Sequence, residues 1–351
     1  MTILIHEAVS GGGMVGRDLP PSWLEEGSAI RRAVAADFRA VPGVEVIETV
    51  DARCLDDRLD LPGPGQIIAD PARPIDLARL ARLADLVVIV APESGGELEA
   101  LARLVEGVGG RSLGSTPEAI ALCSDKSRMA DHLVRLGIPT PPTWRFEPAS
   151  GLPRVDSGSG RVVVKPVDGA GAIDTFVVPA SDPCPPGLLG RGVTLIQPFR
   201  PGMAMSASFL VGLDGGATLL AVGRQRVEVG PGGEVHYRGG EVPVPLPEAL
   251  LAPARRAVES VPGLLGFVGV DFLVLDGDHG VEVLEINPRL TTSIVGLVRL
   301  AEPGVIALAW VDLAVGSAPR DSLHRLRAIQ AAPPVRFRAD GSISDDEGAS
   351  R

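Results

Sequence analysis

The sequence predicts a protein of mixed class, with an α/β region followed by an α+β region. Three observations support this prediction. Short apolar runs alternate with helical patterns over roughly the first third of the chain, short strands surround a glycine-rich loop in the middle, and strands dominate from about residue 200 onward. A length of 351 residues exceeds the usual size of a single core, so we expect two or three domains.

The N-terminal region alternates between the two types of element. Strands are expected at 3–5, 44–50 and 86–90, and helices at 25–38, near 75–83 and at 96–107. Such alternation favours a parallel sheet with crossover helices.

A glycine-rich loop follows the first strand. Gly11, Gly13 and Gly16 match the G-x-G-x-x-G spacing of a dinucleotide site. That site requires a helix to begin inside the loop, so that its N-terminus faces a pyrophosphate, but Pro20 and Pro21 follow almost at once. We interpret the segment as a flexible substrate loop, with a dehydrogenase as the rival interpretation.

The remaining elements follow in order. Two short helices are expected within 117–136, and a Pro-, Gly- and Ser-rich surface connection at 146–160. Strands are expected at 161–166, 173–178, 193–199, 206–213, 217–223 and in a hairpin at 266–287, with helices between 180 and 192, at 247–261 and after 292. Residues 236–242 resemble a loop near the substrate, and the polar tail 339–351 is expected to be disordered.

Charge and cysteine content exclude several classes of function. The chain has 33 basic and 44 acidic residues, a formal net charge of -11, which repels nucleic acid and anionic membranes at long range. Cys54, Cys123 and Cys184 lie far apart without CxxC spacing, so neither a zinc site nor a disulfide framework is indicated. No leader pattern or run of membrane-spanning length is present, so we expect a soluble cytoplasmic protein.

The hairpin at 266–287 carries the most informative pattern. If 276–280 is its loop, counting outward pairs Leu275 with Val281, Leu273 with Val283 and Asp271 with Glu285. Side-chain alternation places Asn287 on the same face. Two carboxylates and an amide therefore converge at the end of an otherwise apolar face.

Like charges directly opposite each other destabilise a sheet, so a cation is expected between Asp271 and Glu285. Oxygen ligands from these residues and Asn287 favour magnesium or manganese over zinc. The alternative is a solvated strand end whose acids point to water.

Two lysines suit a phosphate site. Lys126 begins a helix and Lys165 ends a strand, and an ammonium at either place can bind a phosphate oxygen. Small residues in the loop after Lys165, including Gly169 and Gly171, let backbone N–H groups close over phosphates. The alternatives are a solvated surface lysine and a plain hairpin turn.

Three further positions complete the candidate site. In a nucleotide pocket the backbone from Gln197 to Phe199 would meet an adenine edge, and otherwise it is a crossover between subdomains. Arg289 follows the hairpin acids, and Arg224 alternates with apolar residues. Arginine binds phosphate or carboxylate in a bidentate fork, so Arg289 is the stronger candidate and Arg224 the second.

Taken in order, these motifs resemble the ATP-grasp superfamily of carboxylate-amine ligases. They are Lys126, Lys165 with its glycine loop, LIQPF (195–199), and VDF (270–272) followed by LEINPR (284–289). The resemblance covers roughly residues 1–320. It implies an ATP-grasp fold with a Rossmann-like pre-ATP-grasp domain at 1–116, a small ATP-grasp subdomain with its preceding helices at 117–197, a large subdomain at 198–330 and a C-terminal tail at 331–351.

The resemblance also implies roles for these residues. Lys126 and Lys165 would contact ATP phosphates, and Arg289 would face the transferring phosphate and acyl group. Asp271, Glu285 and Asn287 would hold two magnesium ions, with Glu285 bridging them. A substrate carboxylate would attack ATP to give an acyl phosphate, which an amine would convert to an amide.

A finer resemblance concerns the substrates. ILIHEAVSGGG (3–13) and EINPRLTTS (285–293) look most like the tyramine/tyrosine–glutamate ligases of methanofuran and methylofuran biosynthesis. This implies a γ-glutamyl amide made from small amino-acid and amine substrates. Other ligases, including the D-alanine–D-alanine type, share the core motifs, and a non-catalytic nucleotide-binding regulatory protein is the rival class. The sequence is compatible with a homo-oligomer.

The sequence departs from the ATP-grasp pattern at one position. Met203 follows Gly202, where many ATP-grasp members carry a glutamate that binds the ribose.

Overall fold

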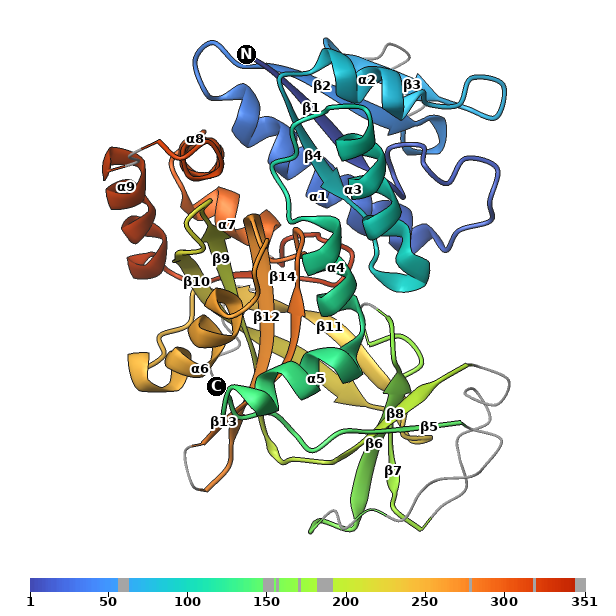
Figure 1. Cartoon of the computed structure of the whole chain (residues 1–351), viewed down its shortest axis with the longest axis vertical. Helices are drawn as coiled ribbons and strands as arrows, with labels where there is room; N and C mark the ends of the chain where they lie inside the picture. Colours follow the sequence, from blue (N-terminus) through green and yellow to red (C-terminus); the bar gives the residue numbers. More distant parts are fainter. Residues whose placement is uncertain are drawn as a thin grey trace.

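The chain folds into three sheets that follow one another in sequence. The computed structural model describes residues 1–55, 63–147, 155, 158–169, 172–181, 192–277, 280–317 and 320–344. Figure 1 shows the blue N-terminal sheet at one end, the six-stranded sheet in the middle and the green four-stranded sheet at the other end.

The first sheet is parallel, as predicted, with strand order β3-β2-β1-β4. Its strands are β1 (Thr2–Glu7), β2 (Glu45–Asp51), β3 (Gln66–Ala69) and β4 (Leu86–Val90), with helices α1 (Pro21–Arg39), α2 (Leu77–Leu83) and α3 (Glu97–Gly107) and the short turns η1 (Ala52–Cys54) and η2 (Ser94–Gly96). Strand β3 was not predicted, because four residues are too few for a clear periodic signal.

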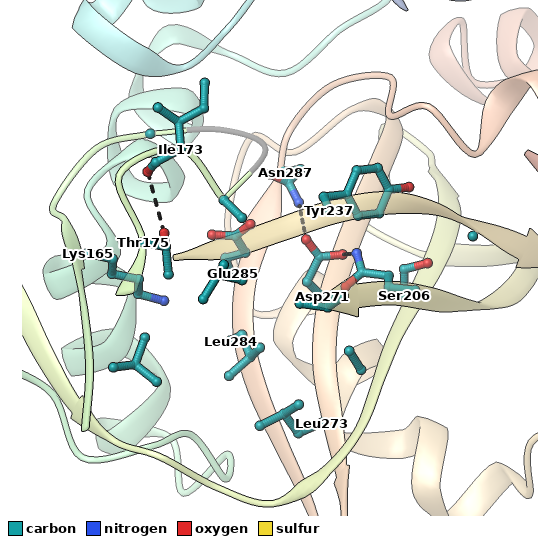
Figure 2. Close-up of a pocket in the computed structure, with 18 of the residues that line it drawn as sticks. Lys165, Ile173, Thr175, Ser206, Tyr237, Asp271, Leu273, Leu284, Glu285 and Asn287 are labelled. Atoms are coloured by element: carbon teal, nitrogen blue, oxygen red, sulfur yellow. Dashed lines mark hydrogen bonds between the residues drawn. The ribbon is translucent and has the colours of Figure 1, made fainter. Parts of the chain in front are cut away.

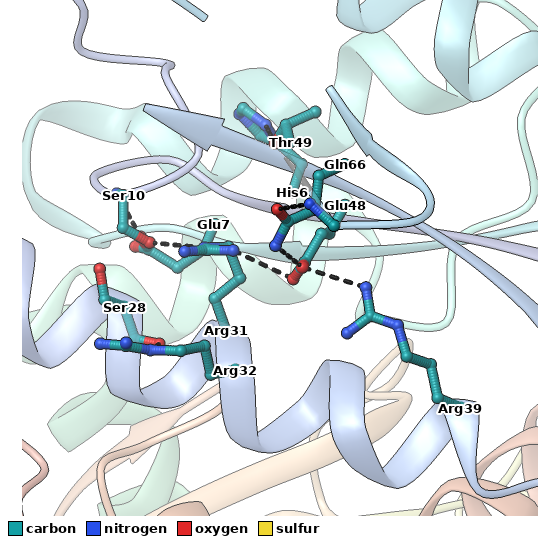
Figure 3. Close-up of polar contacts among 11 residues, drawn as sticks. His6, Glu7, Ser10, Ser28, Arg31, Arg32, Arg39, Glu48, Thr49 and Gln66 are labelled. Atoms are coloured by element: carbon teal, nitrogen blue, oxygen red, sulfur yellow. Dashed lines mark hydrogen bonds and ion pairs between the residues drawn. The ribbon is translucent and has the colours of Figure 1, made fainter. Parts of the chain in front are cut away.

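Part of the glycine-rich loop is packed inside the first domain, and its role as a flexible substrate loop stays a prediction. Gly11 and Gly12 are buried, and the Ser10 backbone N–H donates to Glu7 Oε2 at 2.5 Å. Arg31 joins this loop to β2, donating from Nε to Ser10 and from Nη1 to Glu48 (Figure 3). Helix α1 begins only at Pro21, so no helix N-terminus faces the loop as a dinucleotide site requires.

The predicted pair of helices precedes the small sheet. These are α4 (Pro117–Ser124) and α5 (Lys126–Arg135). The small sheet is antiparallel with order β5-β8-β6-β7 and consists of β5 (Trp144–Phe146), β6 (Arg161–Pro166), β7 (Phe176–Pro179) and β8 (Thr194–Pro198). The helix predicted between 180 and 192 falls on 182–191, outside the described residues.

The large sheet is antiparallel, with order β13-β12-β9-β10-β11-β14. Its strands are β9 (Gly202–Val211), β10 (Ala217–Val229), β11 (Val235–Val242), β12 (Gly266–Leu275), β13 (Val281–Asn287) and β14 (Val335–Phe337). Two predictions are wrong here. Residues 236–242 form most of β11 rather than a loop, and the segment from 331 is no separate tail, because β14 pairs with β11 and Phe337 is buried.

Four helices accompany this sheet: α6 (Glu248–Glu259), α7 (Ile294–Leu300), α8 (Val305–Ala314) and α9 (Arg320–Ala331). The apolar residues of α7, α8 and α9 share one core with the first sheet, in which Ile5, Phe38 of α1 and Trp310 of α8 are buried together, whereas those of α6 pack in a second core with the large sheet. Within the described ranges no single helix is long and apolar enough to cross a membrane, although α7 and α8, bent by 111°, pass that test as a pair.

The hairpin β12–β13 pairs Asp271 with Glu285, as predicted, but its register shifts by one residue next to that pair. Phe272 pairs with Val283 and Val274 with Val281, so the predicted pairs of Leu273 with Val283 and Leu275 with Val281 are wrong. The extra residue is Leu284, which forms a β-bulge. The predicted loop 276–280 includes residues 278 and 279, which lie outside the described residues.

The bulge reverses side-chain alternation along β13. Val281 and Val283, before it, and Ile286, after it, all pack into the same core. Glu285 and Asn287 therefore lie on the opposite face from Val281 and Val283, not at the end of their apolar face as predicted.

Helix α1 is fixed to the C-terminal half of the chain by Asp37. Its carboxylate accepts hydrogen bonds from the backbone N–H groups of Gly304 at 2.6 Å and Ala307 at 2.7 Å, at the start of α8. Asp37 is 6% exposed, so these two N–H groups have little access to water as an alternative acceptor.

We expect Asp37→Ala to lower the free energy of unfolding by about 2 kcal/mol, because it leaves two N–H groups without their acceptor. Urea denaturation measures this change. Asp131→Ala on the exposed side of α5 is the matched control and should change stability little. An equal effect of both substitutions would contradict the role of Asp37.

Candidate active site

One cavity of about 760 Å³ lies between the small and large sheets. Its volume is in the range of small-molecule sites. Figure 2 shows Asp271, Leu273, Leu284, Glu285 and Asn287 of the hairpin beside the cavity, with Lys165 of β6 across from them. The bulge at Leu284 is what turns Glu285 and Asn287 toward this space.

The two hairpin carboxylates have different partners. Asp271 accepts hydrogen bonds from Gln225 Nε2 at 2.8 Å and from Asn287 Nδ2 at 3.2 Å. Glu285 Oε2 instead lies 3.0 Å from Lys126 Nζ. Asn287 thus joins the pair as predicted, whereas Gln225 on β10 was missed, because nothing in the sequence indicates which β10 residues reach β12.

Lys126 connects three elements at the cavity. As the first residue of α5, it donates from its backbone N–H to the Val167 carbonyl at 3.0 Å. Its Nζ donates to the Gly169 carbonyl at 2.6 Å and pairs with Glu285. Lys126 therefore fixes the glycine-rich loop of the small sheet against the hairpin of the large sheet.

Lys165 is 8% exposed and forms no ion pair with any residue that the structure describes. Burial lowers its pKa to about 8, although the charge of Glu285 opposes this shift. A lysine with so little compensation is well suited to an anionic ligand that enters the cavity.

Charge is divided unequally within the carboxyl pair. Burial, together with the charge of Glu285, raises the pKa of Asp271 well above its usual value. Burial would also raise the pKa of Glu285, but Lys126 and Lys165 outweigh it and hold that pKa below its usual value. These opposite shifts favour a proton on Asp271 over one on Glu285, whose carboxylate lies beside Lys126.

Arg289 lines the same cavity and is held by a residue of the first domain. Its Nη2 lies 2.7 Å from Glu93 Oε2, and its Nη1 donates to the Leu290 carbonyl at 3.0 Å. Burial opposes the charged guanidinium, but Glu93 raises the pKa of Arg289 above its ordinary value. Glu93 was missed, although it follows the C-terminal end of β4, where open α/β sheets bind ligands.

The hinge and the glycine-rich loop also border the cavity. Gln197, Phe199 and Gly169 line it, as predicted, while Gly171 lies outside the described residues. The Phe199 N–H already donates to the Arg161 carbonyl at 3.0 Å, so this donor is not free for an adenine edge. Gln197 donates from its side chain to Thr143 Oγ1 at 2.8 Å.

Arg224 lines the cavity as well, but its Nε donates to Glu241 Oε1 at 2.8 Å, so its role in the reaction stays a prediction. A second part of the cavity was missed entirely. It includes Trp23, Glu26, Tyr237 and Asp340, which come from α1, β11 and the C-terminal segment. None of these residues belongs to a local motif, so only the folded chain brings them together.

The donor set suits a hard divalent cation. Magnesium is commonly bound through one or two carboxylates together with substrate phosphates, rather than by a full protein cage. Asp271, Glu285 and Asn287 supply two carboxylates and an amide oxygen, all facing one cavity. Within the described residues no group of three or more His, Cys, Asp or Glu side chains could hold a metal.

Comparison with protein families identifies the class of this protein. Residues 44–120 match the model of a pre-ATP-grasp domain, and residues 123–293 match the model of an ATP-grasp domain. The chain therefore belongs to the ATP-grasp superfamily, whose members include ATP-dependent carboxylate-amine ligases. The predicted fold, an ATP-grasp domain after a pre-ATP-grasp domain, is confirmed.

Within that class, the chain is similar to two tyramine–L-glutamate ligases. It is 27% identical over 272 residues to the enzyme of Methanocaldococcus fervens, covering 77% of this chain and 75% of that protein. It is 30% identical over 215 residues to the enzyme of Methanocaldococcus jannaschii, covering 61% of this chain and 58% of that protein.

Solved structures show the same fold at lower identity. An ATP-grasp superfamily protein from Archaeoglobus fulgidus matches with a TM-score of 0.65 and 22% identity, covering 96% of this chain and 92% of that chain. The D-alanine–D-alanine ligase of Bacillus anthracis complexed with ATP matches with a TM-score of 0.58 and 16% identity, covering 92% of this chain and 99% of that chain.

The low pKa of Lys165 predicts that ADP binding depends on pH. Because this pKa is about 8, affinity should be nearly full at pH 7 and should fall by about tenfold by pH 9, as the ammonium loses its proton. Isothermal titration calorimetry without added metal measures this change. Lys165→Arg stays charged and should bind ADP almost equally at both values. The same loss in both proteins would show that another group titrates.

Proposed function

We propose that this protein is an ATP- and magnesium-dependent ligase that joins L-glutamate to tyramine or tyrosine through an acyl phosphate. The nucleotide would bind between the two ATP-grasp subdomains, 117–197 and 198–330. One observation carries the proposal: the half-buried carboxyl pair Asp271 and Glu285 lies beside Lys126 and Lys165 in a single cavity. Pairs of acids and lysines at such a position suit the charge of a triphosphate with its cation.

Several residues of the chain would have separate roles in phosphoryl transfer. The substrate carboxylate attacks the γ-phosphorus of ATP, ADP leaves, and an acyl phosphate forms. Lys126 and Lys165 would offset negative charge on the phosphates, and Arg289, held by Glu93, would orient the transferring group and the carboxylate. The amine then attacks the acyl carbon and phosphate leaves, which forms the amide.

Asp271, Glu285 and Asn287 would hold the magnesium, which offsets charge on the transferring phosphoryl group when it is bound. The bulge at Leu284 supports this assignment, because it turns Glu285 and Asn287 toward the cavity beside Asp271. Manganese has similar ligand preferences and would serve as a substitute.

The choice of substrates follows the names of the two Methanocaldococcus relatives, tyramine–L-glutamate ligase. The product would then be a γ-glutamyl amide of the kind used in methylofuran-type cofactor biosynthesis. The intact pair of carboxylates favours turnover over a purely regulatory role, because nucleotide binding alone has no need for two opposed acids in a buried site.

Incubation with ATP, magnesium, L-glutamate and tyramine or tyrosine should release ADP and phosphate in equal amounts, together with one new amide. Coupled ADP detection and mass spectrometry measure these products. A mass-spectrometric screen of other amino-acid and amine pairs separates this activity from a D-alanine–D-alanine type. Absence of ADP with every pair, in folded protein that binds ATP, would favour the regulatory alternative.

Glu285→Gln should keep the fold but reduce kcat by about 100-fold or more, because one charge disappears from the proposed metal site and from beside both lysines. Steady-state kinetics measure the loss, and thermal unfolding checks the fold. Glu248→Gln on the exposed side of α6 is the matched control. Near-normal activity of Glu285→Gln would remove the metal assignment.

A further inference from the structure

The cavity extends past the carboxyl pair into a part that phosphoryl transfer does not use. We call it the acidic arm, and its wall includes Trp23, Glu26, Tyr237, Thr292 and Asp340. These residues come from α1, β11, the segment before α7 and the segment after β14. The arm is thus built by the first domain and the C-terminal residues together.

Glu26 is held in a defined place in this arm. Thr292 Oγ1 donates a hydrogen bond to Glu26 Oε1. Burial, and then the charge of Asp340, raise the pKa of Glu26, whereas Thr292 and Arg289 lower it. The carboxylate of Glu26 therefore has an acid on one side and the Arg289 guanidinium on the other.

Close packing brings Asp340 to the same arm. Glu26 and Ala29 lie three residues apart on one face of α1. Gly341 approaches Ala29 so closely that a Cβ on Gly341 would lie 2.4 Å from the Ala29 Cβ. Gly341 also has a φ of +79°, which favours glycine. This contact places Asp340, the preceding residue, beside the Glu26 end of α1.

Both carboxylates of the arm have unused acceptor capacity. Asp340 accepts from the Ser342 backbone N–H at 2.8 Å, and Glu26 accepts from Thr292. In the part of the chain that the structure describes, neither forms an ion pair. Two acids that share a cavity wall without an ion-pair partner favour a cationic ligand group between them.

Arg289 places a positive charge between the acidic arm and the acids of the hairpin. Its pKa is raised by Glu93 and then by Glu26 and Glu285, against the effect of burial, so the guanidinium lies within electrostatic reach of both the arm and the hairpin. A zwitterionic amino acid matches this order of charges. Its reacting carboxylate would lie at Arg289, near the phosphates, and its ammonium would lie in the acidic arm.

The arm also offers aromatic surfaces to such a ligand. Tyr237 is the only tyrosine of the chain, and Trp23 is one of three tryptophans. Both line the cavity, and Tyr237 is close enough to Glu26 for that charge to affect its hydroxyl. Aromatic faces stabilise an ammonium through cation–π attraction.

We infer that the acidic arm binds the ammonium group of the amino acid whose carboxylate is activated, with Glu26 as the specificity-determining residue. This inference rests on the proposed function and adds to it the means by which the enzyme distinguishes an amino acid from a plain carboxylic acid. An acid that lacks the ammonium would leave Glu26 and Asp340 uncompensated, and such a loss discriminates strongly between substrates.

L-Glutamate and glutarate test the inference, because they differ only by the ammonium group. With ATP, magnesium and tyramine, the wild type should use glutamate about 10- to 100-fold better in kcat/KM. Glu26→Gln should lose this preference, mainly through a higher KM for glutamate, with glutarate unchanged. Glu25→Gln, the exposed neighbour on α1, is the matched control and should keep the preference. ADP affinity equal to that of the wild type shows that Glu26→Gln is folded.

Equal use of glutamate and glutarate by the wild type, or an unchanged preference in Glu26→Gln, would overturn the inference while the ligase function stands. If the wild type forms no ADP with either compound, the proposed function fails. Calorimetric binding of glutamate and glutarate then tests whether the acidic arm binds an ammonium group. Glutamate binding that Glu26→Gln loses would support the arm, and its absence in the wild type or its survival in the variant would overturn it.

Discussion

The site depends on the cost of placing two carboxyl groups opposite each other in a buried hairpin. Asp271 and Glu285 pair directly across β12 and β13, where like charges repel. Lys126 offsets the charge of Glu285, and Gln225 and Asn287 donate to Asp271. The large sheet thus needs α5, which carries Lys126, to hold this pair. The same arrangement leaves the cavity ready for a cation and a polyanion together.

Contacts among the three sheets position this chemistry. Lys126 Nζ binds the Gly169 carbonyl of the glycine-rich loop, and Asp168 of that loop accepts from the Gly95 N–H after β4 at 3.0 Å. Glu93, two residues before Gly95, holds Arg289. The first domain therefore supports both the glycine-rich loop and Arg289, which in the proposed function would face the phosphates and the transferring group. Two glycines of its loop after β1, Gly11 and Gly12, are packed inside this domain.

Local patterns predicted much of the fold and part of the set of residues that line the cavity. Alternation of strands and helices was sufficient for the parallel sheet, and counting from the turn was sufficient to pair Asp271 with Glu285. Counting from the turn failed at Leu284, because a β-bulge changes the alternation of side chains and one sequence alone carries no signal for it. Glu93 reaches Arg289, and Glu26 reaches the cavity, only through long-range packing, and β14 joins the sheet by pairing with a strand about a hundred residues earlier. Such contacts leave no periodic pattern to read.

Transfer of a carboxylate oxygen to phosphate tests the central claim most directly. The protein would be incubated with ATP, magnesium, tyramine and glutamate labelled with ¹⁸O in its γ-carboxylate, and the phosphate released would be analysed by mass spectrometry. An acyl phosphate requires that one labelled oxygen leaves with the phosphate when the amine attacks carbon. We expect phosphate that carries one ¹⁸O from fully labelled glutamate. Amide formation with unlabelled phosphate would contradict the account.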